Sequence, residues 1–299
     1  MTWLSSFCSA FRARVEQGRI EHPSDHWYLL VDAAQLPHSE TFDWAREAQR
    51  GRWGNLLLAN PEGKEADLTA WLVPLSLDPT ENAVPEWLDV EAYPFAGTWI
   101  QSPYSLYQIG YHWRVLVDVH LPDKKMGVLR FYDACALQHL SHVLDGEQWK
   151  TLTAPVRRWI FCDRTGQLQC KERDPAPALA SYPLELSEEQ FQALQARTHA
   201  DRIILNMKAE GWLTASGDPF AIFERVSEVI QVAELYGIYE LRRQYEFAVA
   251  ALPWPREMLH SDELGGLLRS AAQGGDSLAK NLPDFFIQQQ KQLDVARGV

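Results

Sequence analysis

The pattern of apolar residues changes in the middle of the chain, and this change constrains the fold more than any other feature. Before a proline- and alanine-rich segment at residues 174–183, apolar runs of strand length alternate with helical patterns. The segment itself is typical of an extended linker, and beyond it the pattern is helical almost to the end. We therefore predict an α+β protein, with a mixed α/β lobe that contains antiparallel hairpins at residues 1–175 and an all-helical lobe at residues 176–299.

Strand-like segments define the first lobe. Residues 27–33 form a mostly apolar run of strand length, which is typical of a buried strand. Two further pairs of strand-like runs are joined by short polar turns that contain glycine, and this pattern predicts β-hairpins. The first pair lies at residues 115–120 and 128–132, and the second lies at residues 157–162 and 167–170.

Capping residues predict where several helices begin and end. Ser102 is followed by a proline, a combination that favours the start of a helix. In the second lobe, Ser187 and Gln190 have the spacing of a capping box. Asp218, again followed by proline, predicts the start of another helix, and Gly237 predicts its end.

The segment Met126–Leu140 predicts a strand that runs directly into a helix. Its aromatic and β-branched residues, up to Phe131 and Tyr132, favour a strand. Asp133 follows where a helix N-cap is expected. Side chains alternate along a strand, so Arg130 is expected on the face opposite Asp133, paired with another carboxylate. We interpret the four residues from Arg130 to Asp133 as a structural motif. Arg130 and Asp133 are therefore not interpreted as a catalytic pair.

The charge of the chain argues against nucleic acid and lipid surfaces as partners. The formal net charge is −12, from 40 acidic and 28 basic residues, and it disfavours contact with phosphate backbones and anionic lipid. No apolar run approaches the ~20 residues that a membrane-spanning helix needs. The first residues also lack the basic start and continuous apolar core of a signal peptide. We therefore expect a cytoplasmic protein without membrane insertion.

Sequence motifs for catalysis are absent. The chain contains no nucleophile elbow, no phosphate-binding loop, no dinucleotide-binding glycine pattern and no His-Glu-x-x-His zinc motif. We therefore expect no catalytic residues, and an enzyme would need a site assembled from scattered side chains.

Metal ligands and disulfides are also not indicated. His139 and His142 lie three residues apart on a predicted helix, but no third ligand is near, so we expect two solvated histidines and no metal. Cys162 and Cys170 flank the turn of the second hairpin and have the placement of a possible disulfide, although free thiols are the preferred interpretation. No cofactor is expected.

Four stretches in order resemble one known family. Tyr28–Ala33 resembles its opening strand, and Leu129–Asp133 contains its Arg-Phe-Tyr-Asp signature. Ser105–Arg114 resembles a helix that ends in His-Leu-Arg, with Trp113 in place of the leucine. Ala154–Trp159 resembles a Gly-Pro stretch before a tryptophan, with alanine in place of the glycine. The family is that of the adaptors, or effector chaperones, of type VI secretion systems, whose shared domain is catalogued as a domain of unknown function.

The resemblance implies a non-enzymatic role and two protein partners. Family members bind a toxic effector in the bacterial cytoplasm, help to mount it on the trimeric spike protein of the secretion machine, and carry no known cofactor. The alternative is an enzyme of hydrolase type, or a secreted effector, with an unrecognised active site.

Two groups of apolar residues are candidate contact surfaces. Aromatic residues are abundant from Trp87 to Trp113, where core packing is preferred over a contact surface. Near the C-terminus, apolar residues lie in predicted loops and short helices, and an exposed patch there would mark a protein-binding site. The equally weighted alternative is that the short helices pack onto the lobe and bury these residues. These candidates are Trp254, Met258, Leu259, Phe285 and Phe286.

Overall fold

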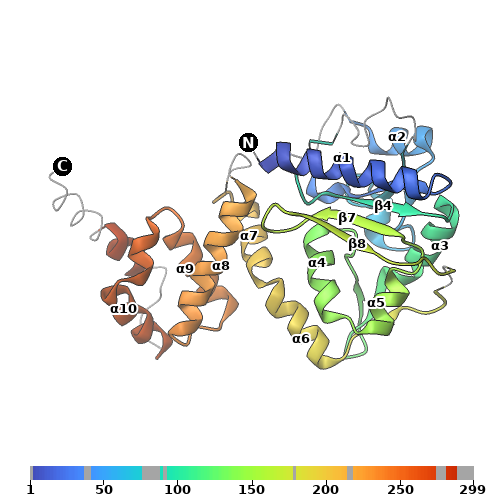
Figure 1. Cartoon of the computed structure of the whole chain (residues 1–299). Coiled ribbons are helices and arrows are strands. Elements are labelled where there is room, and N and C mark those ends of the chain that lie inside the picture. The colour runs from blue at the N-terminus through green and yellow to red at the C-terminus, as the bar shows by residue number, and fades with distance from the viewer. Residues whose placement is uncertain are drawn as a thin grey trace. The chain divides into compact units, whose positions relative to one another are not determined.

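The computed structural model describes residues 3–36, 42–75, 88–89, 93–177, 180–213, 218–273 and 281–287. The chain divides into two compact units, residues 1–196 and 197–299 (Figure 1). The first unit mixes strands and helices, and the described part of the second is helical. The predicted α+β class is therefore confirmed.

Six of the described strands form the main sheet of the first unit, and all its neighbouring strands are antiparallel. The order is β2-β3-β1-β4-β7-β8. These strands are β1 (His26–Asp32), β2 (Gly54–Asn55), β3 (Ala70–Pro74), β4 (Gly97–Ser102), β7 (Arg158–Cys162) and β8 (Leu168–Glu172). The strand predicted at residues 27–33 is β1, which is buried between β3 and β4, and the predicted second hairpin is β7 with β8.

A smaller sheet among the described residues places β5 (Asp118–His120) between β6 (Met126–Val128) and β9 (Leu184–Glu185). β5 and β6 form the predicted first hairpin, whereas β9 runs parallel to β5. The prediction that the strand continues to Tyr132 is wrong, because the chain turns after Val128. In this turn the Phe131 N–H donates to the Leu129 carbonyl oxygen at 2.9 Å.

Helices cover both faces of the main sheet (Figure 1). On one face α1 (Trp3–Glu21) packs on β4, where the ring of Phe11 lies 4.6 Å from that of Trp99. On the other face α3 (Leu106–Leu116) places Trp113 5.2 Å from Trp159, whose indole donates to the Thr98 hydroxyl at 2.9 Å. Thr98 and Trp99 are consecutive on β4 and point to opposite faces, so the sheet is buried on both sides. The other helical segments described before β9 are α2 (Trp44–Gly51), α4 (Ala134–Val143), α5 (Gly146–Leu152), η1 (Ala33–Gln35) and η2 (Pro61–Lys64).

Buried polar contacts hold α1 against the sheet. Gln101 Nε2 donates to the Gly18 carbonyl oxygen at 3.0 Å, and Arg158 donates to Gln101 Oε1 at 2.9 Å and to the Glu21 carboxylate. A Cβ atom added at Gly18 would lie 2.6 Å from Gln101 Oε1 and 2.7 Å from the ring of Trp27. The close approach of α1 to the sheet therefore requires glycine at this position.

The helix predicted to begin after Ser102 begins three residues later. Ser102 is the last residue of β4, and its hydroxyl donates to a backbone carbonyl of the segment before β7. Ser105 is the actual cap of α3: it accepts from the Gln108 N–H at 3.4 Å, and the Gln108 side chain accepts from the Ser105 N–H at 3.0 Å. The prediction from Ser102 and Pro103 is therefore wrong in position, and the actual start is a capping box of Ser105 and Gln108, without a proline.

The segment predicted as a linker is partly built into the first unit. Within residues 174–183, the Ala176 N–H donates to the Ala154 carbonyl oxygen at 2.8 Å, and the Ala180 N–H donates to His112 Nδ1 at 3.0 Å. After this segment β9 pairs with β5, and Gln190 of α6 (Glu188–Arg197) donates to the Val143 carbonyl oxygen of α4 at 3.1 Å. The predicted capping box is confirmed, since Ser187 and Gln190 exchange hydrogen bonds of 3.2 and 3.0 Å. The division between the units therefore falls after residue 196, whereas the sequence pattern placed it after residue 175.

The second unit packs its helices around a core of its own. The helices are α7 (His199–Ala209), α8 (Pro219–Leu235), α9 (Leu241–Ala251), η3 (Arg256–His260) and α10 (Asp262–Ala272), and residues 281–287 are also helical. Asp218 caps α8 by accepting from the Phe220 N–H at 2.9 Å, and Gly237 follows the helix with a φ of 83°. Both predicted boundaries are confirmed. No described helix has the length and hydropathy that crossing a membrane requires.

Replacing Trp113 tests the shared aromatic core of α3 and the sheet. Trp113 is fully buried, and its indole donates to the Leu152 carbonyl oxygen at 3.0 Å. We expect Trp113→Ala to lower the free energy of unfolding by about 3–5 kcal/mol, because it leaves a large cavity. The control Tyr111→Ala removes a half-exposed ring of the same helix and should change it by less than about 0.5 kcal/mol. Urea unfolding followed by tryptophan fluorescence and circular dichroism measures both, and similar losses in the two variants would contradict this account.

Candidate functional site

Arg130 joins the end of the central strand β1 to the start of α4. Its Nη2 atom lies 2.6 Å from Asp32 Oδ2 and 3.7 Å from Asp133 Oδ2. Asp32 is almost fully buried and also accepts from Gln35 Nε2 at 3.1 Å. A buried carboxylate is costly unless it is paired and hydrogen-bonded, and Arg130 supplies this compensation.

Asp133 performs two tasks at once. As predicted, it caps α4, because its Oδ1 accepts from the N–H groups of Cys135 and Ala136 at 2.8 and 3.4 Å. The prediction that Arg130 lies on the opposite face from Asp133 is wrong, since the turn after Val128 replaces strand alternation and brings the two charges together. Burial and the nearby Asp32 carboxylate raise the pKa of Asp133, while Arg130 opposes this shift.

The two aromatic residues between these charges belong to the core. Phe131 is fully buried, with its ring 5.4 Å from that of Trp113 and 6.3 Å from that of Trp159. Tyr132 is also buried, and this burial raises the pKa of its hydroxyl above the ordinary value. All four residues of the predicted structural motif thus make contacts inside the first unit.

His112 and Arg114 of α3 make polar contacts with three different segments. The ring of His112 lies 2.9 Å from the Thr151 carbonyl oxygen through Nε2 and accepts from the Ala180 N–H at 3.0 Å through Nδ1. Arg114 donates through Nε to the Asn55 carbonyl oxygen at 2.8 Å. Because a backbone N–H donates to Nδ1, the ring proton lies on Nε2, and His112 connects α3 to α5 and to the segment before β9.

The expectation of two solvated histidines on α4 is wrong for one of them. His142 is exposed, with Nδ1 2.9 Å from the Gln138 carbonyl oxygen, but His139 is buried. The reason is that α4 is buried over a wide arc, from Cys135 through Leu140 to Val143, and not along one narrow face. Within the described ranges, no three His, Cys, Asp or Glu side chains gather as metal ligands.

The four cysteines form no disulfide in the described structure. All four cysteines are free, and Cys162 lies opposite Leu168, whereas Cys170 lies opposite Ile160. The disulfide left open by the sequence is therefore not formed. Burial raises the pKa of Cys162 to about 12 and that of Cys170 to about 11, so both thiols are protonated at neutral pH.

The apolar residues near the C-terminus form a core and not an exposed patch. Met258 and Leu259 are buried, Phe286 is fully buried, and Trp254 stacks on Phe286 at 5.8 Å. Phe285 is partly buried against the same core. Of the two alternatives, packing of the short helices is the one that the structure shows, because η3, α10 and the helical residues 281–287 pack these side chains together. A protein-binding role for these residues stays a prediction.

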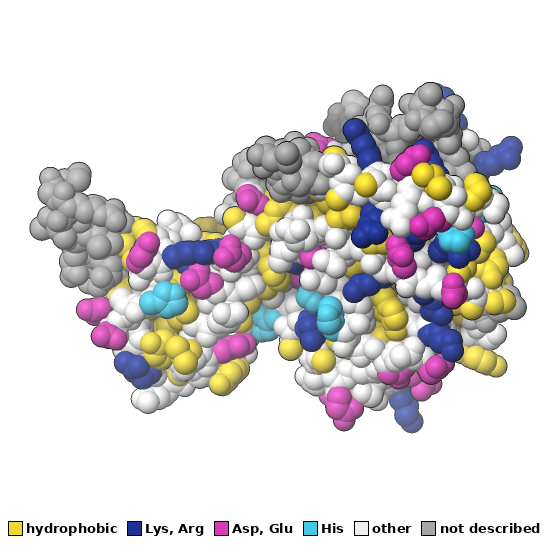
Figure 2. Space-filling model, in the orientation of Figure 1, with side chains coloured by type: hydrophobic (Ala, Val, Ile, Leu, Met, Phe, Trp, Pro, Cys, Tyr) yellow, Lys and Arg dark blue, Asp and Glu magenta, His cyan; other side chains and the backbone are white. Residues whose placement is uncertain are grey.

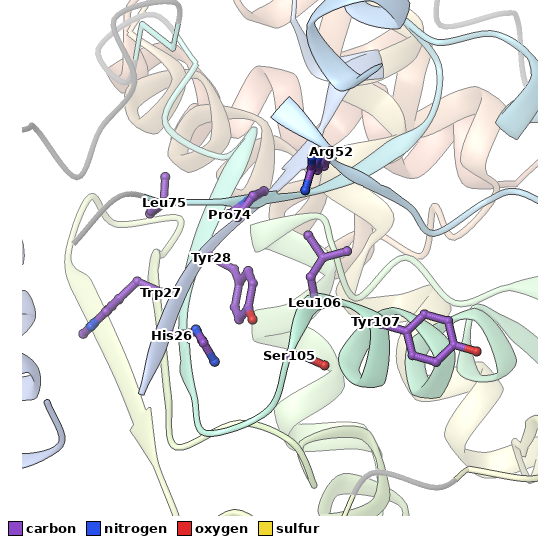
Figure 3. A pocket seen from close by; sticks show the side chains of 9 residues that line it. All are labelled: His26, Trp27, Tyr28, Arg52, Pro74, Leu75, Ser105, Leu106 and Tyr107. Atoms are coloured by element: carbon purple, nitrogen blue, oxygen red, sulfur yellow. The ribbon is translucent and has the colours of Figure 1, made fainter. Parts of the chain in front are cut away.

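A cavity of about 420 Å³ opens on the first unit where β1 begins (Figure 3). It is lined by His26, Trp27, Tyr28, Arg52, Pro74, Leu75, Ser105, Leu106 and Tyr107. At its centre the Tyr28 hydroxyl donates to the Tyr104 carbonyl oxygen at 2.9 Å, and the Tyr107 ring extends outward from α3 (Figure 3). No Asp or Glu is among the described residues that line it.

Sequence reasoning did not single out this cavity. Its lining comes from four separate segments, and only the abundance of aromatic residues around Tyr107 gave a signal. Within that aromatic stretch the structure separates two roles: Phe95, Trp99 and Trp113 are buried, whereas Tyr107 is 73% exposed. Trp87 lies outside the described residues. On the molecular face in Figure 2, acidic and basic side chains are interspersed over both units.

Part of the first unit matches the model of a known protein family. Residues 27–151 match the model of a family described as a domain of unknown function, DUF4123. The match begins in β1 and ends in α5, so it includes Arg130 with both of its carboxylate partners and every lining residue of the cavity except His26. No curated protein and no solved structure matches the chain.

The buried ring of His112 predicts a pH dependence of stability. Burial lowers the pKa of His112 below its ordinary value, so the unfolded chain binds the proton more readily. The contribution of the neutral ring is complete above about pH 6.5, the unfolded value, and is lost as the pH falls below it. We expect wild type to lose more unfolding free energy between pH 7.5 and pH 5.5 than His112→Gln does. His142→Gln is the matched control and should keep the wild-type pH dependence; an unaltered dependence in His112→Gln would contradict this account.

The capping and electrostatic roles of Asp133 can be separated by two substitutions. Asp133→Ala removes both roles and should lower the free energy of unfolding by about 1 kcal/mol, the usual cost of a lost cap. Asp133→Asn keeps a side chain that caps equally well and removes the charge, so we expect a smaller loss. Urea denaturation compares the two, and equal losses would show that the cap is not the main contribution.

Proposed function

We propose that this protein is a non-enzymatic adaptor, or chaperone, that binds a type VI secretion effector and helps to load it onto the spike protein. The match of residues 27–151 to the DUF4123 family is the observation that carries the proposal, because this domain occurs in effector-chaperone and adaptor contexts of that system. The bacterial cytoplasm is the proposed location, because the adaptor would bind the effector there before the effector is secreted.

The geometry of the matched region supports a binding role. Its most distinctive charged groups are used inside the fold, since Arg130 pairs with Asp32 and Asp133, and Asp133 also caps α4. A catalytic group needs access to a substrate and a matched proton donor or acceptor. These side chains instead connect β1, the turn after β6 and α4. They stabilise a scaffold, and the surfaces that contact partner proteins lie on that scaffold.

An affinity capture from the native bacterium tests the proposal. The full-length tagged protein should retain one large effector, the spike protein or both, and mass spectrometry identifies them. The same tag on an unrelated acidic protein controls for non-specific capture. Mixing the purified proteins should then give a stoichiometric complex on size-exclusion chromatography. If the tagged protein is repeatedly captured at mild salt without an effector or a spike protein, the adaptor role is contradicted.

Expression of the chain by itself distinguishes the alternative. An adaptor should not slow the growth of a host that lacks the other components. An enzyme that acts as a secreted effector should be toxic when expressed alone and should need an immunity partner. Toxicity that is relieved by such a partner would favour the alternative.

A further inference from the structure

The two described sheets of the first unit end in four edge strands, and three of these edges are protected. β2 and β8 are the edges of the main sheet, and β6 and β9 are the edges of the smaller one. The Arg114 side chain donates to the backbone of β2 at 2.8 Å, and the Gln148 side chain donates to that of β9 at 2.6 Å. β8 carries the exposed charges of Lys171 and Glu172. Natural proteins protect sheet edges by such charges and covering groups, because a free edge pairs readily with another strand.

The edge strand β6 has neither kind of protection. It consists of Met126, Gly127 and Val128, so it carries no charge. The side chains of Met126 and Val128 are 51% and 40% exposed. Among the described residues, β5 is the only strand that pairs with β6, and no side chain donates to the backbone of β6. An apolar, uncharged and uncovered edge favours pairing with a further strand.

The pairing of β6 with β5 decides which backbone groups of β6 point outward. Hydrogen-bonded positions alternate along an antiparallel pair. Bonds at both ends of the hairpin fix this alternation, from the Leu121 N–H to the Lys125 carbonyl oxygen at 2.9 Å and from the Leu129 N–H to the Val117 carbonyl oxygen at 2.7 Å. Gly127, which lies opposite Val119, therefore bonds to β5. The N–H and carbonyl groups of Met126 and Val128 point away from β5, so the free edge offers both donors and acceptors.

We propose that β6 pairs antiparallel with β6 of a second copy of this chain, with the two-fold axis at Gly127. In this register Met126 lies opposite Val128 of the second copy, and Val128 lies opposite Met126 of the second copy. Both are hydrogen-bonded positions, so all the outward donors and acceptors of the two edges are used. The two smaller sheets then form one continuous sheet. This interaction does not depend on the proposed adaptor function.

The side chains of β6 match those of a second copy in the same register. Met126 and Val128 lie on one face of the strand, so the methionine of each copy packs beside the valine of the other as an apolar cross-strand pair. Gly127 lies opposite Gly127 of the second copy, where the Cα atoms of an antiparallel pair approach to about 4.5 Å and no side chain intervenes. Because β6 is uncharged, no like charges face each other along the paired edge. A two-fold interface requires such self-complementarity, and it is the reason for assigning a second copy to this edge.

The dimer is expected to be weak and to strengthen with salt. Only three residues of each copy pair, whereas stable interfaces contain about 20–30 residues a side. Each copy also carries a formal net charge of −12, so the two copies repel each other at long range. Salt screens this repulsion and leaves backbone hydrogen bonds and apolar contacts in place. An association held by ion pairs would instead weaken as the salt concentration rises.

Analytical ultracentrifugation of the purified full-length protein tests self-association. Wild type should form a dimer at concentrations between about 10 µM and about 1 mM. Val128→Lys and Met126→Lys place a charge at the edge and should raise the dissociation constant at least about tenfold. Ile20→Lys is the matched control, because it makes the same change at an exposed aliphatic residue of α1, and it should dimerise as wild type does.

A proline tests the backbone groups of the edge separately from its side chains. The N–H of Val128 points outward, so Val128→Pro removes a donor of the free edge and leaves the hydrogen bonds to β5 in place. This variant should weaken the dimer at least about tenfold. Val128→Thr keeps the N–H and a branched side chain, so it should dimerise nearly as well as wild type. Circular dichroism and urea unfolding check that each variant is folded.

Engineered cysteines test the register of the paired strands. Cys8 and Cys170, the partly exposed native thiols, are first changed to serine. Met126→Cys and Val128→Cys proteins are then oxidised separately and as a mixture. Hydrogen-bonded partners have Cα atoms about 5.5 Å apart, a separation that suits a disulfide. The mixture should therefore cross-link more than either protein alone, and equal cross-linking in all three samples would overturn the register.

Two results would overturn the proposal as a whole. One is a wild-type protein that stays monomeric up to about 1 mM at both low and high salt, and the other is a dimer that the substitutions in β6 leave unchanged. A monomer whose β6 edge pairs with a strand of a different protein would have the same consequence. No effector or spike protein is present in these experiments, so either result leaves the proposed adaptor function to its own test.

Discussion

The ion pair between Asp32 and Arg130 is the interaction on which the first unit depends most. Asp32 ends the central strand β1 and is almost fully buried, so its charge needs a partner at 2.6 Å. Arg130 belongs to the turn after β6 and also approaches Asp133, the cap of α4. One guanidinium therefore fixes the position of a helix relative to the middle of a sheet. The turn after Val128 brings Arg130 within reach of both carboxylates.

Local signals in the sequence predicted local structure well. The caps at Asp133, Ser187 and Asp218 depend on hydrogen bonds within three residues, and the structure has all three. The hairpin β7–β8 likewise depends on a short turn. The pairing of Arg130 with Asp32 joins distant positions, and neither residue type specifies its partner, so no pattern in the sequence predicted it.

Burial near the C-terminus was not predictable for a related reason. Met258 and Leu259 lie in a short 3₁₀ segment whose length gives no clear periodicity, so their exposure depends on what packs over them. The cavity was missed because its nine lining residues come from four separate parts of the first unit.

The parallel pairing of β5 with β9 has a consequence for the order in which the protein is made. Val119 lies opposite Leu184, so β5 must wait for its second neighbour until the intervening helices and the β7–β8 hairpin have been synthesised. The pairing of β5 with β9 closes a long loop of the chain. The loss of conformational entropy in this loop is offset only after the contacts between the two strands have formed. On the ribosome, the smaller sheet is therefore completed after the main sheet has all its strands, and the nascent chain exposes one edge of β5 until then.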